Sequence, residues 1–152
     1  MDSDDCAKID DPDDAAWVAA ERQRVIEYLA DQGVEHAGVS AAPRWFVSPY
    51  LAIWAARSRT KPDFVGWWAI SGDVPTDYMT CRDQHDVADV LIGFAKRWSA
   101  AAERMAAGEQ PDGFTVGDPQ SAKELAPLLA SRAALLQSFG ERMKRGELLD
   151  ED

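Results

Sequence analysis

The sequence predicts an α+β fold: a mainly α-helical single domain with a short antiparallel β-hairpin. Three segments repeat their apolar residues at helical spacing, and two aromatic or β-branched runs flank a short polar turn. The chain has 152 residues, of which 46% are hydrophobic and 28% charged, the composition of one soluble globular domain. Because an isolated hairpin is only marginally stable, we expect the helices to cover it and close one core.

The first helix is predicted to run from Asp13 or Asp14, either of which can cap it, to about Gln32. Its apolar side carries Val18, Val25, Tyr28 and Leu29. Gly33 is expected to end this helix. Residues 34–43 show no apolar periodicity and are predicted to form a connecting loop.

Residues 44–59 fit two templates. As a strand they alternate between two faces, whereas as a helix they would have Ser48 as the cap and Pro49 at the first helical position. The segment that follows favours the strand, because residues 60–63 are typical of a turn and residues 65–71 are rich in aromatic and β-branched side chains. We therefore predict that the two runs pair as the hairpin.

Two further helices are predicted in the second half of the chain. Asp83 is expected to cap the first of them, which ends at Gly108. Its apolar stripe comprises Val87, Val90, Leu91, Phe94, Trp98, Ala101, Ala102 and Met105. A loop over residues 108–119 follows. Because a proline at position 127 would interrupt a helix, we expect a short turn over residues 120–126 and the last helix over residues 127–144.

The formal net charge of −11 is concentrated at the two ends of the chain. Residues 1–14 carry −6 and residues 147–152 carry −4, which leaves −1 for residues 15–146. This near-neutral body argues against a nucleic-acid partner, a DNA mimic and a decoy for a basic toxin. We therefore expect a disordered acidic arm over residues 1–14, one domain over residues 15–146 and an acidic tail over residues 147–152.

The sequence also bears on location and on cofactors. No apolar stretch approaches the roughly 18 residues of a membrane-spanning helix, and the acidic N-terminus is unlike a secretory signal, so we expect a cytoplasmic protein with no membrane partner. Cys6 and Cys81 are expected to be free thiols. The chain has no zinc-ligand spacing and no glycine-rich phosphate loop.

A metal site can be drawn from the acids and the histidine between residues 73 and 86. Its members would be Asp73, Asp77, Asp83, His85 and Asp86. Helix capping and the first helical turn already account for Asp83 and Asp86, which leaves too few ligands. We therefore predict no metal and no cofactor.

The densest chemistry lies in residues 66–78, GWWAISGDVPTDY. Further motifs are Pro43-Arg44-Trp45, Ser48-Pro49-Tyr50, Trp54, Gly117-Asp118-Pro119 and Ser131-Arg132. On these motifs the sequence resembles, from Trp17 to about Met143, a family of small bacterial proteins catalogued as a domain of unknown function (number 4826). The resemblance implies a group of related proteins and no activity.

Ten residues in and around this run form the candidate binding surface: Arg44, Trp45, Tyr50, Trp54, Trp67, Trp68, Asp73, Thr76, Asp77 and Tyr78. In a structural interpretation, Thr76 and Asp77 bond nearby backbone N–H groups in a turn that Pro75 begins. In a functional interpretation, Asp73 and Asp77 converge in an aromatic-walled cleft, where partial burial would create a general acid or base.

The adjacent tryptophans give the strongest argument for a surface. Neighbouring strand residues point to opposite faces, so Trp67 and Trp68 cannot both enter one core. We therefore favour a non-enzymatic binding or interaction protein whose partner is an unidentified protein or small molecule. The alternatives are a small hydrolase with Asp73 or Asp77 as acid or base, and an immunity-type toxin antagonist, against which the neutral body argues. A homodimer formed through a helix face is compatible with a chain of this size.

Overall fold

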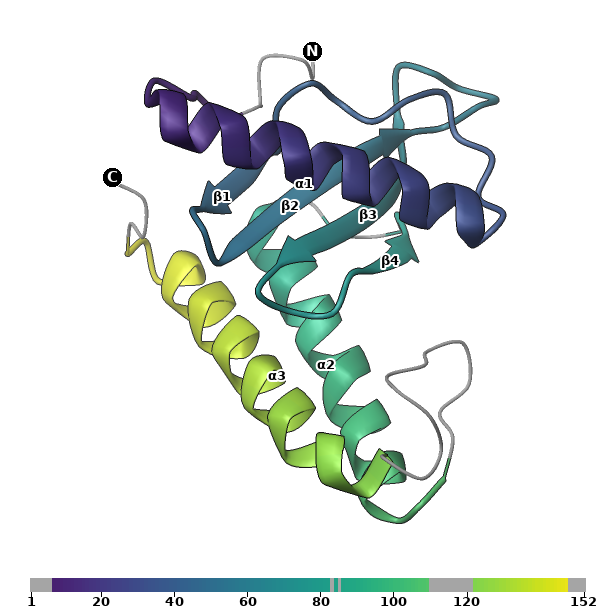
Figure 1. Ribbon diagram of the computed structural model, residues 1–152, viewed down its shortest axis with the longest axis vertical. Helices are drawn as coiled ribbons and strands as arrows, with labels where there is room; N and C mark the ends of the chain where they lie inside the picture. Colours follow the sequence, from purple (N-terminus) through teal and green to yellow (C-terminus); the bar gives the residue numbers. More distant parts are fainter. Residues whose placement is uncertain (1–6, 83, 85, 110–121, 148–152) are drawn as a thin grey trace. The chain divides into compact units, whose positions relative to one another are not determined.

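The computed structural model describes residues 7–82, 84, 86–109 and 122–147 (Figure 1). The chain divides into two compact units, Met1–Gln84 and His85–Asp152, and each is described by itself. Residues 1–6, 83, 85, 110–121 and 148–152 lie outside the described residues, and with them the predictions for the Cys6 thiol, for His85 and for the loop over residues 110–119.

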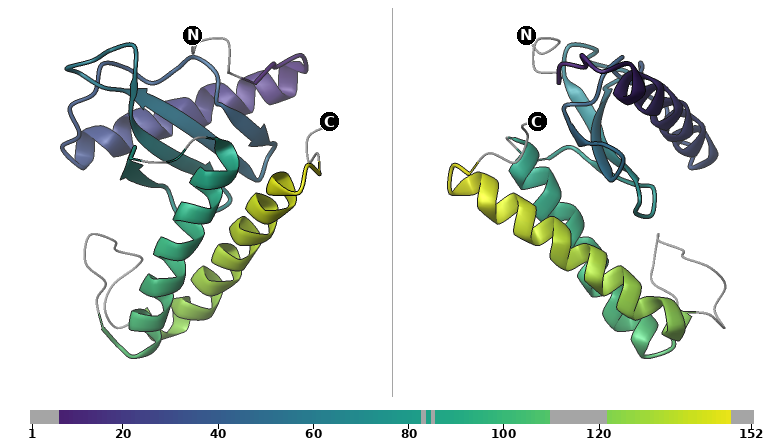
Figure 2. Two further views of the ribbon diagram at one scale, coloured as in Figure 1. Left: turned by 180° about the vertical axis from the view of Figure 1, so that it is seen from behind. Right: turned by 60° about the vertical axis from the view of Figure 1, so that its left-hand side comes forward.

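The first unit contains one helix and a four-stranded antiparallel sheet. Its elements are α1 (Pro12–Asp31), β1 (Trp45–Val47), β2 (Leu51–Arg57), β3 (Val65–Gly72) and β4 (Asp77–Thr80). The strands follow one another in the order β1-β2-β3-β4, and α1 lies along one face of the sheet (Figures 1 and 2). The α+β class is confirmed, and the predicted hairpin forms the centre of the sheet as β2 and β3.

The register of the sheet explains how the core forms. Trp54 pairs with Ala69 and Ala56 with Trp67, so these four side chains share one face of the sheet. That face packs against the buried stripe of α1, which comprises Val18, Val25 and Leu29. Trp67 and Trp68 occupy opposite faces, as the alternation along the strand predicted.

The start of α1 corrects the predicted cap. Asp11, rather than Asp13 or Asp14, is the N-cap, and its carboxylate accepts a hydrogen bond of 2.7 Å from the backbone N–H of Asp13. Pro12 therefore occupies the first helical position, where its missing N–H costs no intrahelical bond. The helix ends with Gln32 as its C-cap and is followed by Gly33 at φ 77°.

Two short strands were not predicted. A turn at Ser48–Tyr50, which includes a cis bond between Ser48 and Pro49, separates β1 from β2, so residues 44–59 form two strands instead of one. The predicted turn around Pro75 and Asp77 leads directly into β4 at Asp77. Both short strands depend on pairing with a longer neighbour, which a local sequence pattern does not report.

The loop between α1 and β1 is held by side-chain bonds to the helix. The Arg22 guanidinium donates hydrogen bonds of 2.9 Å to the carbonyl of Ser40 and 2.8 Å to that of Val39. Val39 also forms an isolated bridge with Ala56 of β2. Before the helix, the N–H of Ala7 donates to the carbonyl of Pro43 at 2.8 Å, which ties the start of the described chain to the same loop.

The second unit is a pair of helices, α2 (Val87–Ala106) and α3 (Ala122–Lys144), which lie side by side (Figure 2). Asp86, rather than Asp83, caps α2 and accepts a 2.8 Å hydrogen bond from the N–H of Asp89. The last helix begins five residues before the predicted start, with Pro127 inside it. Pro127 lies in the second turn of α3, so it removes one hydrogen bond close to the start of the helix. This loss does not prevent the helix from beginning before the proline.

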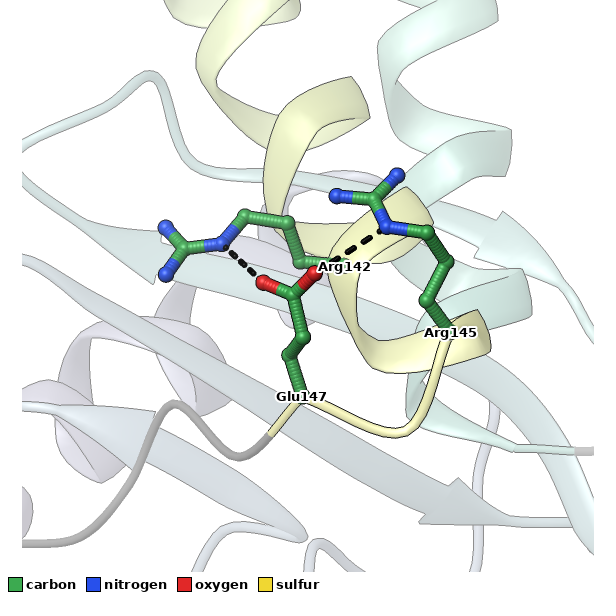
Figure 3. A network of polar contacts seen from close by, with 3 residues as sticks. All are labelled: Arg142, Arg145 and Glu147. Atoms are coloured by element: carbon green, nitrogen blue, oxygen red, sulfur yellow. Dashed lines mark hydrogen bonds and ion pairs between the residues drawn. The ribbon is translucent and has the colours of Figure 1, made fainter.

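Charged side chains form ion pairs at the C-terminal end of α3. Lys144 pairs with Asp89 and lies 4.0 Å from the carboxylate of Asp86, so a cation at a helix C-terminus faces acids at a helix N-terminus. The hydrogen bond to Asp89 raises the pKa of Lys144 above its ordinary value. The Glu147 carboxylate lies 3.0 Å from the Arg142 side chain and 3.1 Å from that of Arg145. Figure 3 shows the carboxylate between the two arginines.

In the part of the chain that the structure describes, no helix combines the length and the apolarity needed to cross a membrane.

Candidate functional site

An open pocket lies within the first unit, where α1 passes the turn before β2 and the end of β3. Its volume is about 320 Å³. We call it the Glu21 pocket, and its lining comprises Trp17, Glu21, Arg24, Pro49, Tyr50, Gly72 and Asp73. Two of the ten predicted residues, Tyr50 and Asp73, therefore share a site with three side chains of α1.

Backbone contacts hold one side of the pocket together. The N–H of Asp73 donates to the carbonyl of Tyr50 at 2.8 Å, and the N–H of Tyr50 donates to the carbonyl of Val47 at 2.7 Å. Gly72 has φ 126°, and a Cβ there would lie 2.8 Å from the carbonyl carbon of Tyr50. Only glycine fits this close approach, so Gly72 sets the spacing between Tyr50 and Asp73.

Glu21 is the unusual member of the lining. It is only 4% exposed and lies among Val18, Val25 and Leu29, the buried residues of α1. Its Oε2 is 3.5 Å from an Arg24 nitrogen, while its Oε1 has no hydrogen-bond partner among the described residues. Burial of an incompletely bonded carboxylate costs free energy, so this position is not optimised for stability.

Aromatic side chains flank the carboxylate. The Trp17 ring lies 6.1 Å from that of Phe46, with an angle of 32° between their planes, so β1 supports one wall of the pocket. Tyr50 is 57% exposed. The pocket thus combines an acid removed from water with one supported and one exposed aromatic side chain.

The two aspartates of the motif lie in different surroundings. Asp77 is fully buried and accepts hydrogen bonds from the N–H of Tyr78 at 2.8 Å and the hydroxyl of Tyr28 at 3.5 Å. Tyr28 follows Glu21 by seven residues, which places it about 10 Å further along α1. Asp73 lines the Glu21 pocket and Asp77 does not, so the structure does not bring the pair into this pocket.

The other predicted residues mainly serve the sheet. The indole N–H of Trp54 donates to Ser71 at 3.1 Å, and both residues are fully buried. The Arg44 guanidinium lies 5.4 Å from the centre of the buried Trp68 ring. Tyr78 meets Tyr28 edge to face at 5.9 Å. Trp45, Trp67 and Thr76 are partly buried.

The sequence patterns did not identify the residues of α1 that line the pocket. One signal was available: Glu21 lies three residues after Val18 and four before Val25, which places an acid on the apolar stripe of the helix. No comparable signal marks Trp17 or Arg24, because their place in the pocket depends on residues that follow them by more than 20 positions.

Metal ligands do not cluster in the described part of the chain. No group of three or more His, Cys, Asp or Glu side chains lies close enough there to hold an ion. The carboxylates of the Glu21 pocket are accompanied by one guanidinium and by the side chains of Trp17 and Tyr50.

A family model described as Domain of unknown function (DUF4826) matches residues 11–145. The match extends from the N-cap of α1 to the end of α3 and includes every residue that lines the pocket. No curated protein and no solved structure matches the chain.

Proposed function

The chain belongs to the family described as Domain of unknown function (DUF4826), and because that description carries no activity, we propose on the pocket's geometry that this is a non-enzymatic protein that binds a small molecule. The observation that carries the proposal is Glu21, a carboxylate buried on the apolar stripe of α1 with one oxygen unbonded, in the lining of an open pocket. Residues held at a cost in stability are typical of binding sites.

The dimensions of the pocket support a ligand of modest size. Small-molecule sites usually measure about 300–1,000 Å³. A volume of about 320 Å³ lies at the lower end of that range. Trp17 and Tyr50 supply the aromatic walls, while Glu21 and Asp73 supply the polar groups.

The proposal narrows the predicted aromatic and acidic surface to one part of it. Tyr50 and Asp73 stay in the site, and Trp17, Glu21 and Arg24 join them. Trp54 and Asp77, which are fully buried, support the sheet instead of contacting a ligand.

The test is an NMR titration of the ¹⁵N-labelled full chain with four aromatic fragments: benzylamine, benzyl alcohol, benzoate and phenylalanine. At least one fragment is expected to shift the Trp17 indole signal and the backbone signals of Tyr50 and Asp73. The Tyr50→Ala variant should weaken that binding. Phe64→Ala is the matched control, because Phe64 is 65% exposed in the same unit and lies outside the pocket lining. The absence of shifts with all four fragments contradicts the proposal.

A small hydrolase is the second candidate, and one observation favours it. Asp73 and Glu21 line the same open pocket, so one of them is placed to act as a general acid or base. Hydrolysis of p-nitrophenyl acetate or of p-nitrophenyl glycosides by the full chain, lost in Asp73→Asn, would support this candidate over simple binding.

A further inference from the structure

We infer that the Glu21 pocket selects a protonated amine, meaning an organic ligand that carries an ammonium group beside an apolar body. This inference rests on the proposed function and adds the chemical class of the ligand. It depends on three features of the lining: its charge, its unbonded oxygen and its aromatic walls.

The charge of the lining favours a cation. The carboxylates of Glu21 and Asp73 outnumber the single guanidinium of Arg24, so the formal charge of the lining is negative. Arg24 is already engaged with Oε2 of Glu21 and is about half exposed, with a side-chain exposure of 54%. The buried Glu21 carboxylate attracts a positive ligand, whereas an anionic ligand would bring a further negative charge beside it.

The unbonded oxygen specifies a hydrogen-bond donor. Glu21 is buried, and its Oε1 lacks a donor among the described residues. An ammonium group offers three donors, and its hydrogen bonds to a carboxylate are charge-assisted. Glu21 Oε1 is inaccessible to solvent in this structure. Because the terminal torsion of a glutamate is broad, rotation of the carboxylate is the movement that would turn this oxygen toward an incoming donor.

The aromatic walls favour an organic cation over a metal ion. Ca²⁺ takes 6–8 oxygen ligands, whereas the lining offers two carboxylates. Trp17 and Tyr50 instead present aromatic rings, which attract an ammonium group through cation–π contacts and cover an apolar ligand body. The lining therefore matches a protonated amine in its charge, in its hydrogen-bond acceptor and in its aromatic side chains.

The experiment compares three fragments of nearly equal size, each titrated separately into the ¹⁵N-labelled full chain at low salt and neutral pH. Benzylamine is cationic, benzyl alcohol is neutral and benzoate is anionic. We expect benzylamine to bind at least about tenfold more tightly than the other two, the ratio that one charge-assisted hydrogen bond supplies. The shifts should map to Trp17, Tyr50 and Asp73.

Two variants test the named groups. Glu21→Gln keeps the shape of the side chain and is expected to lower benzylamine affinity about tenfold, with little change for benzyl alcohol. Asp73→Asn, at an exposed position, is expected to lower it by a smaller factor. Glu27→Gln is the matched control on the same helix, because Glu27 is exposed and lies outside the lining, and it should leave the affinity unchanged.

The outcomes separate this inference from the proposed function. If benzyl alcohol or benzoate binds in the pocket at least as tightly as benzylamine, the pocket is a binding site and the amine inference is overturned. If no fragment binds, both fail. The phenylalanine titration of the first test then compares two sources of the ammonium group. If phenylalanine binds more tightly than benzylamine, and Arg24→Gln removes that difference, the ligand is an amino acid. If the two fragments bind equally, the ligand is a simple amine.

Discussion

Replacement of Glu21 by methionine should make the protein more stable. The side chain is 6% exposed, and its ion pair with Arg24 spans 3.5 Å to a partner that is 54% exposed. Such a half-exposed pair contributes at most about 1 kcal/mol. Replacement of a buried ion pair by apolar side chains of similar volume is often neutral or stabilises proteins by about 1–4 kcal/mol, and here Arg24 is exposed enough to keep its hydration when Glu21 is replaced. Methionine suits both the helix and the apolar stripe. We therefore expect the free energy of unfolding to rise by about 2 kcal/mol.

Thermal unfolding followed by circular dichroism provides the assay. For a chain of this length, about 2 kcal/mol corresponds to a rise in Tm of about 4–8 °C. Glu27→Met, at an exposed position of the same helix, is the control and should stay within about 0.5 kcal/mol of the parent. Arg24→Met should lower Tm, because it leaves the buried carboxylate without its ion pair. A Tm for Glu21→Met at or below that of the control would refute the argument that Glu21 is held at a cost.

Three further changes test the frame around the pocket. Gly72→Ala should lower the free energy of unfolding, measured in urea, by at least about 2 kcal/mol more than Gly33→Ala. Both glycines have positive φ, but only at Gly72 would a Cβ clash with backbone atoms. Equal losses for the two variants would contradict this reasoning. Asp77→Asn should lower the free energy of unfolding by about 1.5–3 kcal/mol, because the hydrogen bonds that this buried carboxylate accepts from the Tyr78 N–H and the Tyr28 hydroxyl would no longer be charge-assisted; a level or raised value would indicate an acid kept for another purpose. Hydrogen bonds from Arg142 and Arg145 hold the pKa of Glu147 below its ordinary value. The contact therefore stabilises the end of α3 fully at pH values above the ordinary pKa of a glutamate, and this stabilisation is lost as the pH falls through the lowered pKa. An NMR titration in which Arg142→Gln leaves the Glu147 pKa unchanged would contradict that assignment.

The helices and the central hairpin could be predicted because their signals are local. The apolar stripe that includes Val18, Val25 and Leu29 repeats at helical spacing, and the aromatic run of β3 follows a recognisable turn. Strands β1 and β4 were missed because each has four residues or fewer and exists only through pairing with a neighbour. The predicted caps were wrong because several aspartates precede each helix, and the chain's path before the helix selects among them.

The pocket could be predicted only in part, for a different reason. Tyr50 and Asp73 belong to motifs that stand out in the sequence, but Glu21 and Trp17 join them through the packing of α1 on the sheet. The apolar pattern of a helix identifies which face is buried and does not identify the strand end that this face will meet. An acidic residue on that buried face is the local sign that the contact between the helix and the strand end includes a polar site.

The distinctive run at residues 66–78 serves mainly to build the frame of the pocket. Ser71 satisfies the indole of Trp54, Gly72 permits the close approach of Tyr50, and Asp77 anchors the start of β4. Of the acids in this run, only Asp73 lines the pocket. Substitutions within the run should therefore change stability first, whereas substitutions of Glu21 should change stability and ligand affinity in opposite directions. That opposition distinguishes a binding group from a structural one, and it directs the search for function to α1 as well as to the motif.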